Sequence, residues 1–164
     1  MKRLLLAIPL LALLLASCNR TEKFDKDLYE GYYSALYSME ISKMVASNTA
    51  DEWHKAVYGS GDVNGAIRNV LQGYKDQGIA DSLNYYTKRM DSLTSELADP
   101  PSDRKEVYDD FVRLVGEVNT LYNYAANPTG NFNNYTNGLA QQIAVTERLN
   151  SEFVLKHSKY IKKK

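Results

Sequence analysis

Residues 83–97 read LNYYTKRMDSLTSEL, and apolar side chains recur in this stretch at alternating spacings of three and four residues. The recurring positions are Leu83, Tyr86, Met90, Leu93 and Leu97. Because an α-helix completes a turn every 3.6 residues, this spacing places all of them on one stripe of a helix. A strand would instead alternate apolar and polar residues with a period of two. The stretch therefore predicts an amphipathic helix that packs against a core.

The same period covers most of the chain and predicts four long helices, over residues 22–58, 62–98, 102–126 and 132–160. The first stripe comprises Leu28, Tyr32, Ala35, Met39, Ser42, Ala46, Thr49, Trp53 and Ala56. Ile67, Leu71 and Tyr74 begin the second stripe, and Val107, Phe111, Leu114, Val118, Leu121 and Ala125 form the third. The fourth comprises Phe132, Tyr135, Leu139, Gln142, Thr146, Leu149, Phe153 and Tyr160. No stretch alternates in the manner of a strand, so the sequence predicts an all-α domain.

Glycine, proline and asparagine separate these helices. The breaks fall at Gly59-Ser60-Gly61-Asp62, at Asp99-Pro100-Pro101-Ser102 and at Asn127-Pro128-Thr129-Gly130-Asn131. Short connections between long helices favour antiparallel neighbours, so we expect an antiparallel up-down four-helix bundle. Residues 47–49 and 73–78 are weaker helix formers, and breaks there would divide the first and second helices into shorter ones.

The N-terminus carries an export pattern. Lys2 and Arg3 precede the apolar run Leu4 to Leu15, and small residues follow before Cys18. This order describes a secretory signal peptide. A spanning helix needs about 20 apolar residues, so the run is too short to cross a membrane.

Leu15-Ala16-Ser17-Cys18 resembles the lipobox of bacterial lipoproteins. The resemblance covers residues 1–18 and implies cleavage before Cys18 and attachment of acyl chains to that cysteine. Cys18 is the only cysteine of the chain, and a lone thiol in an exported protein needs a separate role. Two or more acyl chains hold a protein stably on a membrane. An ordinary secreted protein with an incidental cysteine is the alternative.

These features divide the chain into a signal peptide over 1–17, a lipidated tether over 18–23, a helical bundle over 24–160 and a basic tail over 161–164. Asn19 differs from the aspartate that resembles an inner-membrane retention signal. In a host with two membranes, the pattern therefore favours a cell-envelope location at the outer membrane. The membrane leaflet stays open.

Composition narrows the function. Loss of Lys2 and Arg3 with the signal leaves 18 basic residues against 20 acidic ones, a net charge of −2. Nucleic-acid binding usually requires a strongly basic surface, so no nucleic-acid partner is expected. The chain has two histidines and one cysteine, too few for a closed zinc site, so we expect no metal and no cofactor.

Asp51 and His54 are three residues apart on a predicted helix, which places a carboxylate and an imidazole on one face. We interpret them as a surface pair and assign no catalytic residue. Motifs for a serine nucleophile, haem attachment or phosphate binding are absent from the sequence.

Tyr33, Tyr37, Ile41 and Met44 form a second apolar row on the first helix, opposite its main stripe. A helix that is apolar on two sides is normally covered on two sides. The helix is central in the bundle, or the chain bends near Asn48, or a partner covers the row. We take the row as a hypothetical partner-binding surface.

A second hypothetical binding surface lies in the connection over 127–138, where asparagines surround two aromatic residues. Its residues are Phe132, Asn133, Asn134 and Tyr135. Amides beside an aromatic face can bind sugars or peptide backbone, but asparagine is also a common turn and capping residue. The topology places this connection and residues 58–64 at the tip far from the lipid.

The C-terminal tail supplies a hypothetical membrane contact through Lys156, Lys159, Lys162, Lys163 and Lys164. Each lysine near anionic head groups contributes on the order of 1 kcal/mol. A solvated, frayed terminus is the alternative.

Taken together, the sequence predicts a membrane-anchored envelope lipoprotein that acts as a non-catalytic binding or accessory module for a protein or glycan partner. The alternative is a small envelope enzyme, of hydrolase type, whose site the sequence does not reveal.

Overall fold

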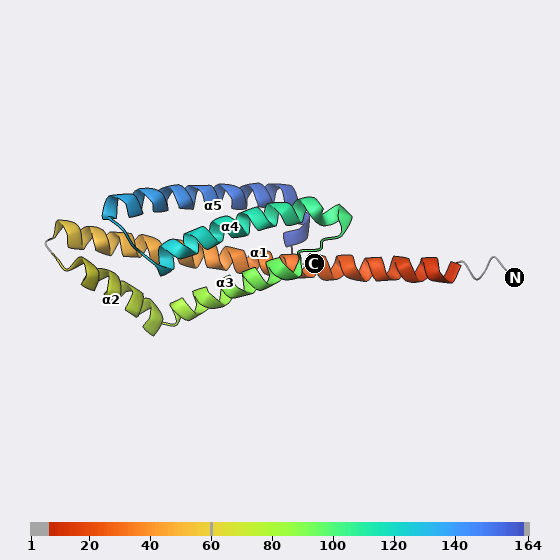
Figure 1. Ribbon diagram of the computed structural model, residues 1–164, viewed down its shortest axis with the longest axis horizontal. Helices are drawn as coiled ribbons and strands as arrows, with labels where there is room; N and C mark the ends of the chain where they lie inside the picture. The colour runs from red at the N-terminus through yellow and green to blue at the C-terminus, as the bar shows by residue number, and fades with distance from the viewer. Residues whose placement is uncertain (1–6, 60, 163–164) are drawn as a thin grey trace.

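The computed structural model describes residues 7–59 and 61–162, with side chains from Asn19 onward. This part of the chain contains five α-helices and one short 3₁₀ helix, and no strand (Figure 1). The helices are α1 (Ala7–Tyr58), α2 (Val63–Asp76), α3 (Ile79–Glu96), η1 (Ser102–Arg104), α4 (Lys105–Ala126) and α5 (Phe132–Ile161). The prediction of an all-helical domain is confirmed.

The second predicted helix is two helices in the structure. It is interrupted between α2 and α3, where Gln77 and Gly78 form a turn. Gly78 has φ 72°, a left-handed conformation that glycine adopts without steric cost. The first predicted helix, in contrast, runs unbroken through residues 47–49. Thr49 is fully buried there, and its hydroxyl donates a hydrogen bond to the Val45 carbonyl at 2.8 Å.

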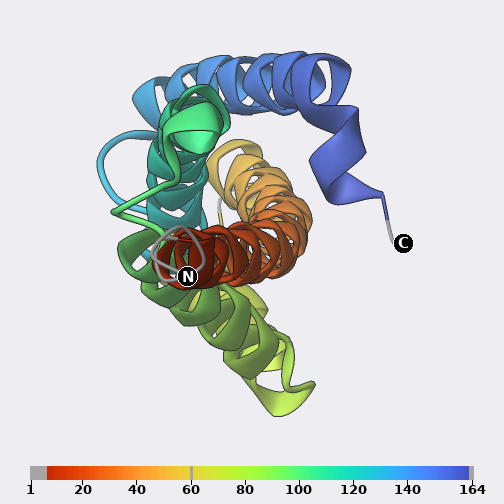
Figure 2. The same cartoon turned by 90° about the vertical axis from the view of Figure 1, so that its right-hand side faces the viewer.

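Helix α1 lies at the centre of the molecule. It contacts α2, α3, α4 and α5, whereas within the described residues α5 contacts neither α2 nor α3. The end-on view in Figure 2 shows α4 and α5 on one side of α1 and α2 and α3 on the other. This position explains why α1 carries apolar residues on two faces.

Small side chains on α1 allow its neighbours to approach closely. Gly31 is buried, and a Cβ atom at this position would lie 2.9 Å from Cζ of Phe111. Ser38 is fully buried, and its Oγ lies 2.8 Å from Oγ1 of Thr87 on α3. Ser42 is also fully buried, and its hydroxyl has no hydrogen-bond partner among the described residues. Close packing around α1 is therefore achieved partly with polar side chains.

The last turn of α5 folds toward α1. His157 has non-helical dihedral angles, φ −122° and ψ 19°, and bends the helix. Its Nε2 lies 2.9 Å from Oδ2 of Asp110 on α4. Beyond the bend Ile161 is buried, and its carbonyl accepts a hydrogen bond from the Tyr33 hydroxyl at 3.4 Å. The end of α5 therefore lies beside the middle of α1 (Figure 1).

Asp110 on α4 binds two residues at this bend, His157 and Lys156. Burial raises the pKa of its carboxyl, but hydrogen bonds from His157 and Lys156 lower it by more, so the pKa lies below its usual value. A lowered pKa means that the carboxylate form is favoured by folding.

We expect Gly31→Leu to lower the free energy of unfolding by about 1–3 kcal/mol, because the added atoms overpack against Phe111. Gly116→Leu is the matched control, since a Cβ there meets no atom within 4 Å. Urea denaturation of both variants measures the difference. Equal effects of the two substitutions would contradict the close approach at Gly31.

Asp110→Asn is expected to change the acid limb of the stability profile. The stabilisation by the native carboxylate is present above pH about 4 and is lost as pH falls through the lowered pKa. The variant should therefore be less stable at pH 7 and lose less stability between roughly pH 4 and pH 2. Urea denaturation at a series of pH values tests this, with the exposed Asp81→Asn as control. An unchanged acid slope in Asp110→Asn would refute the assignment.

Candidate functional site

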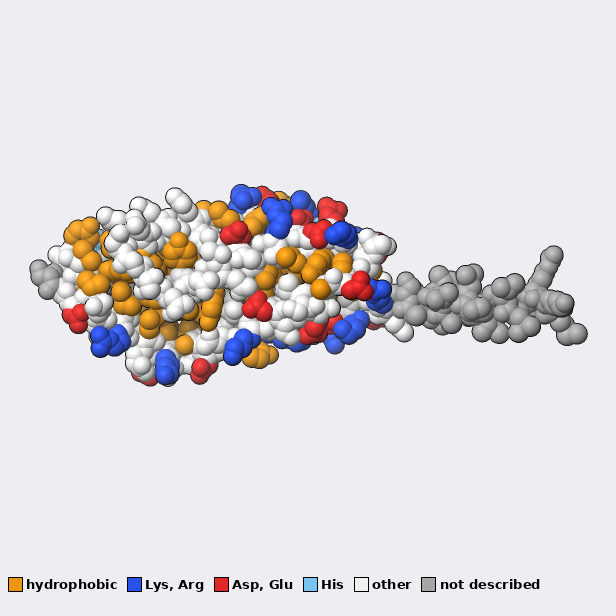
Figure 3. Space-filling view, viewed as in Figure 1, with side chains coloured by type: hydrophobic (Ala, Val, Ile, Leu, Met, Phe, Trp, Pro, Cys, Tyr) orange, Lys and Arg blue, Asp and Glu red, His pale blue; other side chains and the backbone are white. Residues whose placement is uncertain are grey.

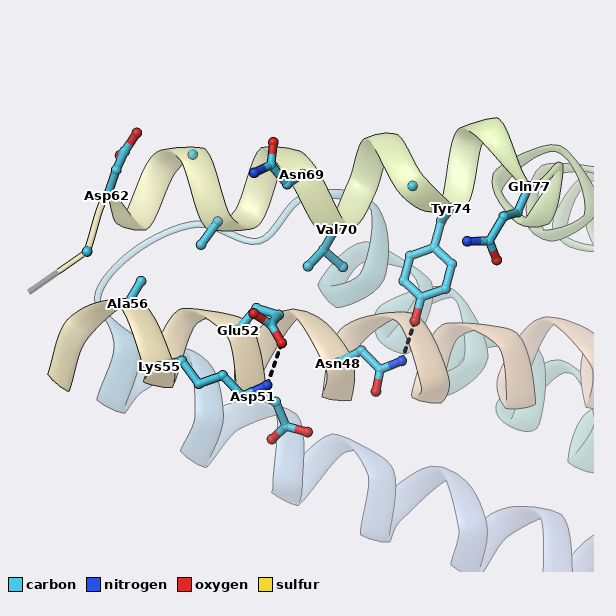
Figure 4. Close-up of a pocket in the computed structure, with 14 residues that line it drawn as sticks. Asn48, Asp51, Glu52, Lys55, Ala56, Asp62, Asn69, Val70, Tyr74 and Gln77 are labelled. Carbon is cyan, nitrogen blue, oxygen red and sulfur yellow. Dashed lines mark hydrogen bonds and ion pairs between the residues drawn. The ribbon is translucent and has the colours of Figure 1, made fainter. Parts of the chain in front are cut away.

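An open groove of about 990 Å³ lies between α1 and α2 (Figure 4). From α1 it is lined by Asn48, Asp51, Glu52, Lys55 and Ala56. From the connection and α2 it is lined by Gly61, Asp62, Gly65, Ala66, Asn69, Val70, Gly73, Tyr74 and Gln77. The groove lies in the half of the molecule away from the N-terminal segment.

The sequence of α2 explains why the groove stays open. Gly65, Asn69, Gly73 and Gln77 follow one another at intervals of four and therefore form one stripe along the helix. Two of these four residues have no side chain; the space beside Gly73 is unfilled, whereas the Asp62 carboxylate occupies the space beside Gly65. A Cβ atom at Gly73 would meet no atom within 4 Å.

Helix α2 is held to the rest of the molecule along one edge. Its apolar residues Val63, Ile67, Leu71 and Tyr74 are half-buried against the core, and no residue of α2 is buried. A second hollow of about 360 Å³ lies on another side of α2, between Ile67, Leu71 and Pro128 of the connection before α5. Hollows therefore flank α2, and its packing is the weakest among the helices.

One side-chain hydrogen bond crosses the groove in the described part of the chain. Nδ2 of Asn48 donates to the hydroxyl of Tyr74, as Figure 4 shows. Lys55 binds Glu52 on its own helix, with Nζ 2.6 Å from Oε1. Asp51 and Asp62 form no ion pair with any described residue. The groove is thus lined by the three carboxylates of Asp51, Glu52 and Asp62 and by one ammonium, that of Lys55, which Asp51 also attracts.

The tip beyond the groove carries an aromatic cluster. The ring of His54 lies 4.6 Å from that of Tyr58 and 5.6 Å from that of Phe132. The ring of Trp53 lies 5.2 Å from that of Tyr135. The sequence pattern indicated Phe132 and Tyr135 but not their aromatic neighbours on α1, because residues so far apart in the sequence share no local pattern.

The predicted pair Asp51 and His54 is not formed by the described side chains. Asp51 lines the groove, whereas His54 packs among aromatic rings. The correct periodicity placed both on one helix, but residues three apart differ by about 60° around the helix axis. That difference is enough to direct them toward different neighbours.

The predicted tip surface is divided between core and solvent. Tyr135 is buried, and its hydroxyl donates to the Tyr124 carbonyl at 3.0 Å; burial raises its pKa. Phe132 is half-buried, whereas Asn133 and Asn134 are exposed. The Asn131 side chain accepts a hydrogen bond from the Asn134 amide at 2.9 Å, which caps α5. Asn131, in the same asparagine-rich connection, therefore has a structural role as the N-cap of α5.

The second row of α1 lies on its open side, between α3 and α5. Tyr33 and Ile41 are half-buried by other parts of the chain. Tyr37 is 50% exposed and stacks on Tyr86 of α3 with ring centroids 4.8 Å apart. Met44 is 40% exposed. The central position of α1 accounts for much of this row, and Tyr37 and Met44 stay accessible.

The lysines of the C-terminal tail differ in their surroundings. Nζ of Lys156 lies 3.2 Å from Oδ2 of Asp110, and Nζ of Lys159 lies 4.6 Å from the centre of the Tyr160 ring. Lys162 is exposed. Lys163 and Lys164, together with the side chain of Cys18, lie outside the described residues.

Within the described residues, no group of three or more His, Cys, Asp and Glu side chains could hold a metal ion. None of the described helical stretches combines the length and hydropathy of a membrane span. Comparison with protein-family models, with curated proteins and with solved structures finds no match for this chain.

The hydrogen bond between Asn48 and Tyr74 can be tested for its contribution to the packing of α2 against α1. Asn48→Ala should accelerate amide hydrogen exchange in α2 about fivefold, because a lost hydrogen bond costs about 1 kcal/mol. Asn119→Ala is the matched control, since Asn119 joins α4 to Asp91 of α3 through a similar exposed bond of 2.8 Å. Exchange measured by mass spectrometry should separate the two variants. Unchanged exchange in α2 of Asn48→Ala would show that this bond does not hold the helix.

Proposed function

We propose that this protein is a bacterial envelope lipoprotein, anchored through lipid on Cys18, that acts as a non-catalytic binding module with its ligand site in the α1–α2 groove. The observation that carries the proposal is the continuity of α1. This one helix contains the segment with Cys18 and also forms one wall of the groove. Anchor and binding site are thus parts of one rigid element.

The geometry suits presentation of a ligand away from a membrane. From Arg20 to Asn48 the helix rises by about 40 Å, at 1.5 Å per residue. Residues 19–23 are helical, so the tether that the sequence predicted contributes a short, stiff connection. On the face in Figure 3, charged side chains crowd the half next to the N-terminal segment, and hydrophobic side chains gather toward the other half.

Further parts of the proposal concern architecture and location. We regard α2 and α3 together as the second member of an antiparallel up-down four-helix bundle, with α1, α4 and α5 as the others. The end of α5 lies beside the middle of α1, so Lys159 and Lys162 would stand on the membrane side as a secondary contact. Asn19 favours the outer membrane in a host with two membranes.

A binding role is favoured over catalysis by the arrangement of the groove. The groove is open, whereas catalytic sites usually exclude water around the reacting groups. His54, the only histidine near this end in the sequence, packs against Phe132 instead of facing the groove carboxylates. The hydrolase alternative would require a turnover that falls when Asp51 or His54 is replaced.

The anchor is tested by feeding cells that express the full chain with an alkyne-labelled fatty acid. The wild-type protein should carry the label and sediment with membranes, and Cys18→Ser should lose both properties. Ser151→Ala, on the exposed face of α5, is the control and should keep them. An unlabelled wild-type protein in the soluble fraction would overturn the proposed anchoring.

The binding site is tested by site-specific photo-cross-linking in intact cells. A photoreactive residue at Asn69, in the groove, should give a defined adduct, and one at the exposed Thr120 on α4 should not. Adducts at both positions, or at neither, would refute the groove as the binding site while leaving the anchor intact.

A further inference from the structure

We propose that the α1–α2 groove binds a neutral, polyhydroxylated chain, that is, an oligosaccharide. The inference rests on the proposed function, because it names the ligand class of the same site.

The first argument is the mixture of donors and acceptors on the groove walls. The amides of Asn48, Asn69 and Gln77 each present an acceptor oxygen and a donor nitrogen. A sugar hydroxyl also donates one hydrogen bond and accepts others. Side-chain amides on both walls therefore match a ligand whose polar groups all have this dual character.

The second argument is the charge of the groove. Asp51 and Asp62 carry no paired cation among the described residues, and Lys55 is engaged by Glu52 at 2.6 Å. An anionic ligand such as a phosphate would face the three carboxylates of Asp51, Glu52 and Asp62, and the one ammonium of the groove, that of Lys55, is already bound by Glu52 and attracted by Asp51. Carboxylates accept hydrogen bonds from hydroxyl groups strongly, because charge-assisted bonds are about twice as strong as neutral ones. The charge thus excludes anions and favours a hydroxyl-rich ligand.

The third argument is the kind of apolar surface that the groove offers, which comes from small aliphatic side chains and one ring. Apolar contact is offered by Ala56, Ala66, Val70 and the ring of Tyr74. Protein interfaces depend on aromatic or arginine anchors that fill deep pockets, and this groove has no deep apolar pocket to receive one. The C–H faces of sugar rings require only shallow apolar contact of this kind.

The fourth argument is the shape. A volume of about 990 Å³ lies at the upper end of the range of small-molecule sites, about 300–1,000 Å³. The groove is open to solvent and runs between two helices (Figure 4), so it can accept several linked rings and let a longer chain continue beyond them.

Gly73 offers a substitution that fills the groove without disturbing the fold. A Cβ there meets no atom within 4 Å, so the ring in Gly73→Phe can occupy the space of the ligand. Gly116→Phe is the matched control, because Gly116 is also helical, exposed and free of neighbours within 4 Å, but lies on α4. Circular dichroism should show that both variants keep the helical content of the wild type.

The experiment uses the full lipidated chain in detergent micelles, fluorescently labelled, on an array of neutral oligosaccharides built from glucose, galactose, mannose and N-acetylglucosamine. Sulfated oligosaccharides and lysine-rich peptides form the comparison arms. The wild type should bind at least one neutral oligosaccharide, Gly73→Phe should weaken that binding at least tenfold, and Gly116→Phe should not. Titration calorimetry with the bound oligosaccharide measures the ratio.

Three results would overturn the inference: absence of binding to every neutral oligosaccharide, equal binding by Gly73→Phe and the wild type, or preference for the sulfated or peptide arm. A specific adduct from Asn69 in cells, together with any of these results, would leave the proposed function standing and reject only the ligand class. Absence of the Asn69 adduct would instead reject the groove as the binding site and leave only the proposed anchor.

Discussion

The enclosure of α1 by four other helices is the constraint on which the rest of the structure depends. A helix with neighbours on several sides cannot carry large side chains all around, because the neighbours must approach to within about 8–10 Å. Small residues on α1 allow this close approach, namely Gly31, Ser38 and Ser42. The cost is visible at Ser42, whose buried hydroxyl has no partner in the described part of the chain.

The same constraint makes α2 the exception. The other α-helices bury several residues each, whereas α2 is amphipathic but buries none. Of its labelled side chains in Figure 4, Val70 and Tyr74 point toward α1, so the free energy that holds α2 in place comes from one apolar edge and the hydrogen bond between Tyr74 and Asn48. Elements with few buried contacts open at low free energy, and ligand sites are often formed from such elements. In this molecule, weak packing and the candidate site coincide.

Sequence periodicity was sufficient for the all-helical class and for most of the core, because both are set by local spacing, but it joined α2 and α3 into one helix. Leu28, Phe111 and Phe153 stand on predicted stripes and are almost fully buried. The groove could not be predicted, since Gly65, Asn69, Gly73 and Gln77 have the composition of a solvated face. Two glycines eight residues apart on one helix face were the available signal, and only the position of α1 opposite them gives that signal a meaning.

Long-range contacts escaped prediction for a related reason. Arg104 binds Asp25 with Nε 2.8 Å from Oδ1, across 79 positions of sequence, and His157 meets Asp110 across 47. The identity of such partners depends on how the helices rotate against each other, and local spacing leaves that rotation undetermined. The bend at His157 likewise has no signature in the apolar period.

The unbroken course of α1 has a consequence for orientation. A straight helix fixes both the distance and the rotation between any two of its residues, since each residue turns the chain by about 100° around the helix axis. Phe24 is the first core side chain along α1. In the proposed lipoprotein, the number of residues between the acylated cysteine and Phe24 therefore sets the direction in which the groove opens around the helix axis. A single residue inserted between Cys18 and Arg20 would turn the direction in which the groove opens by about 100° relative to the membrane, and it would leave the bond between Arg20 and Asp99 in place.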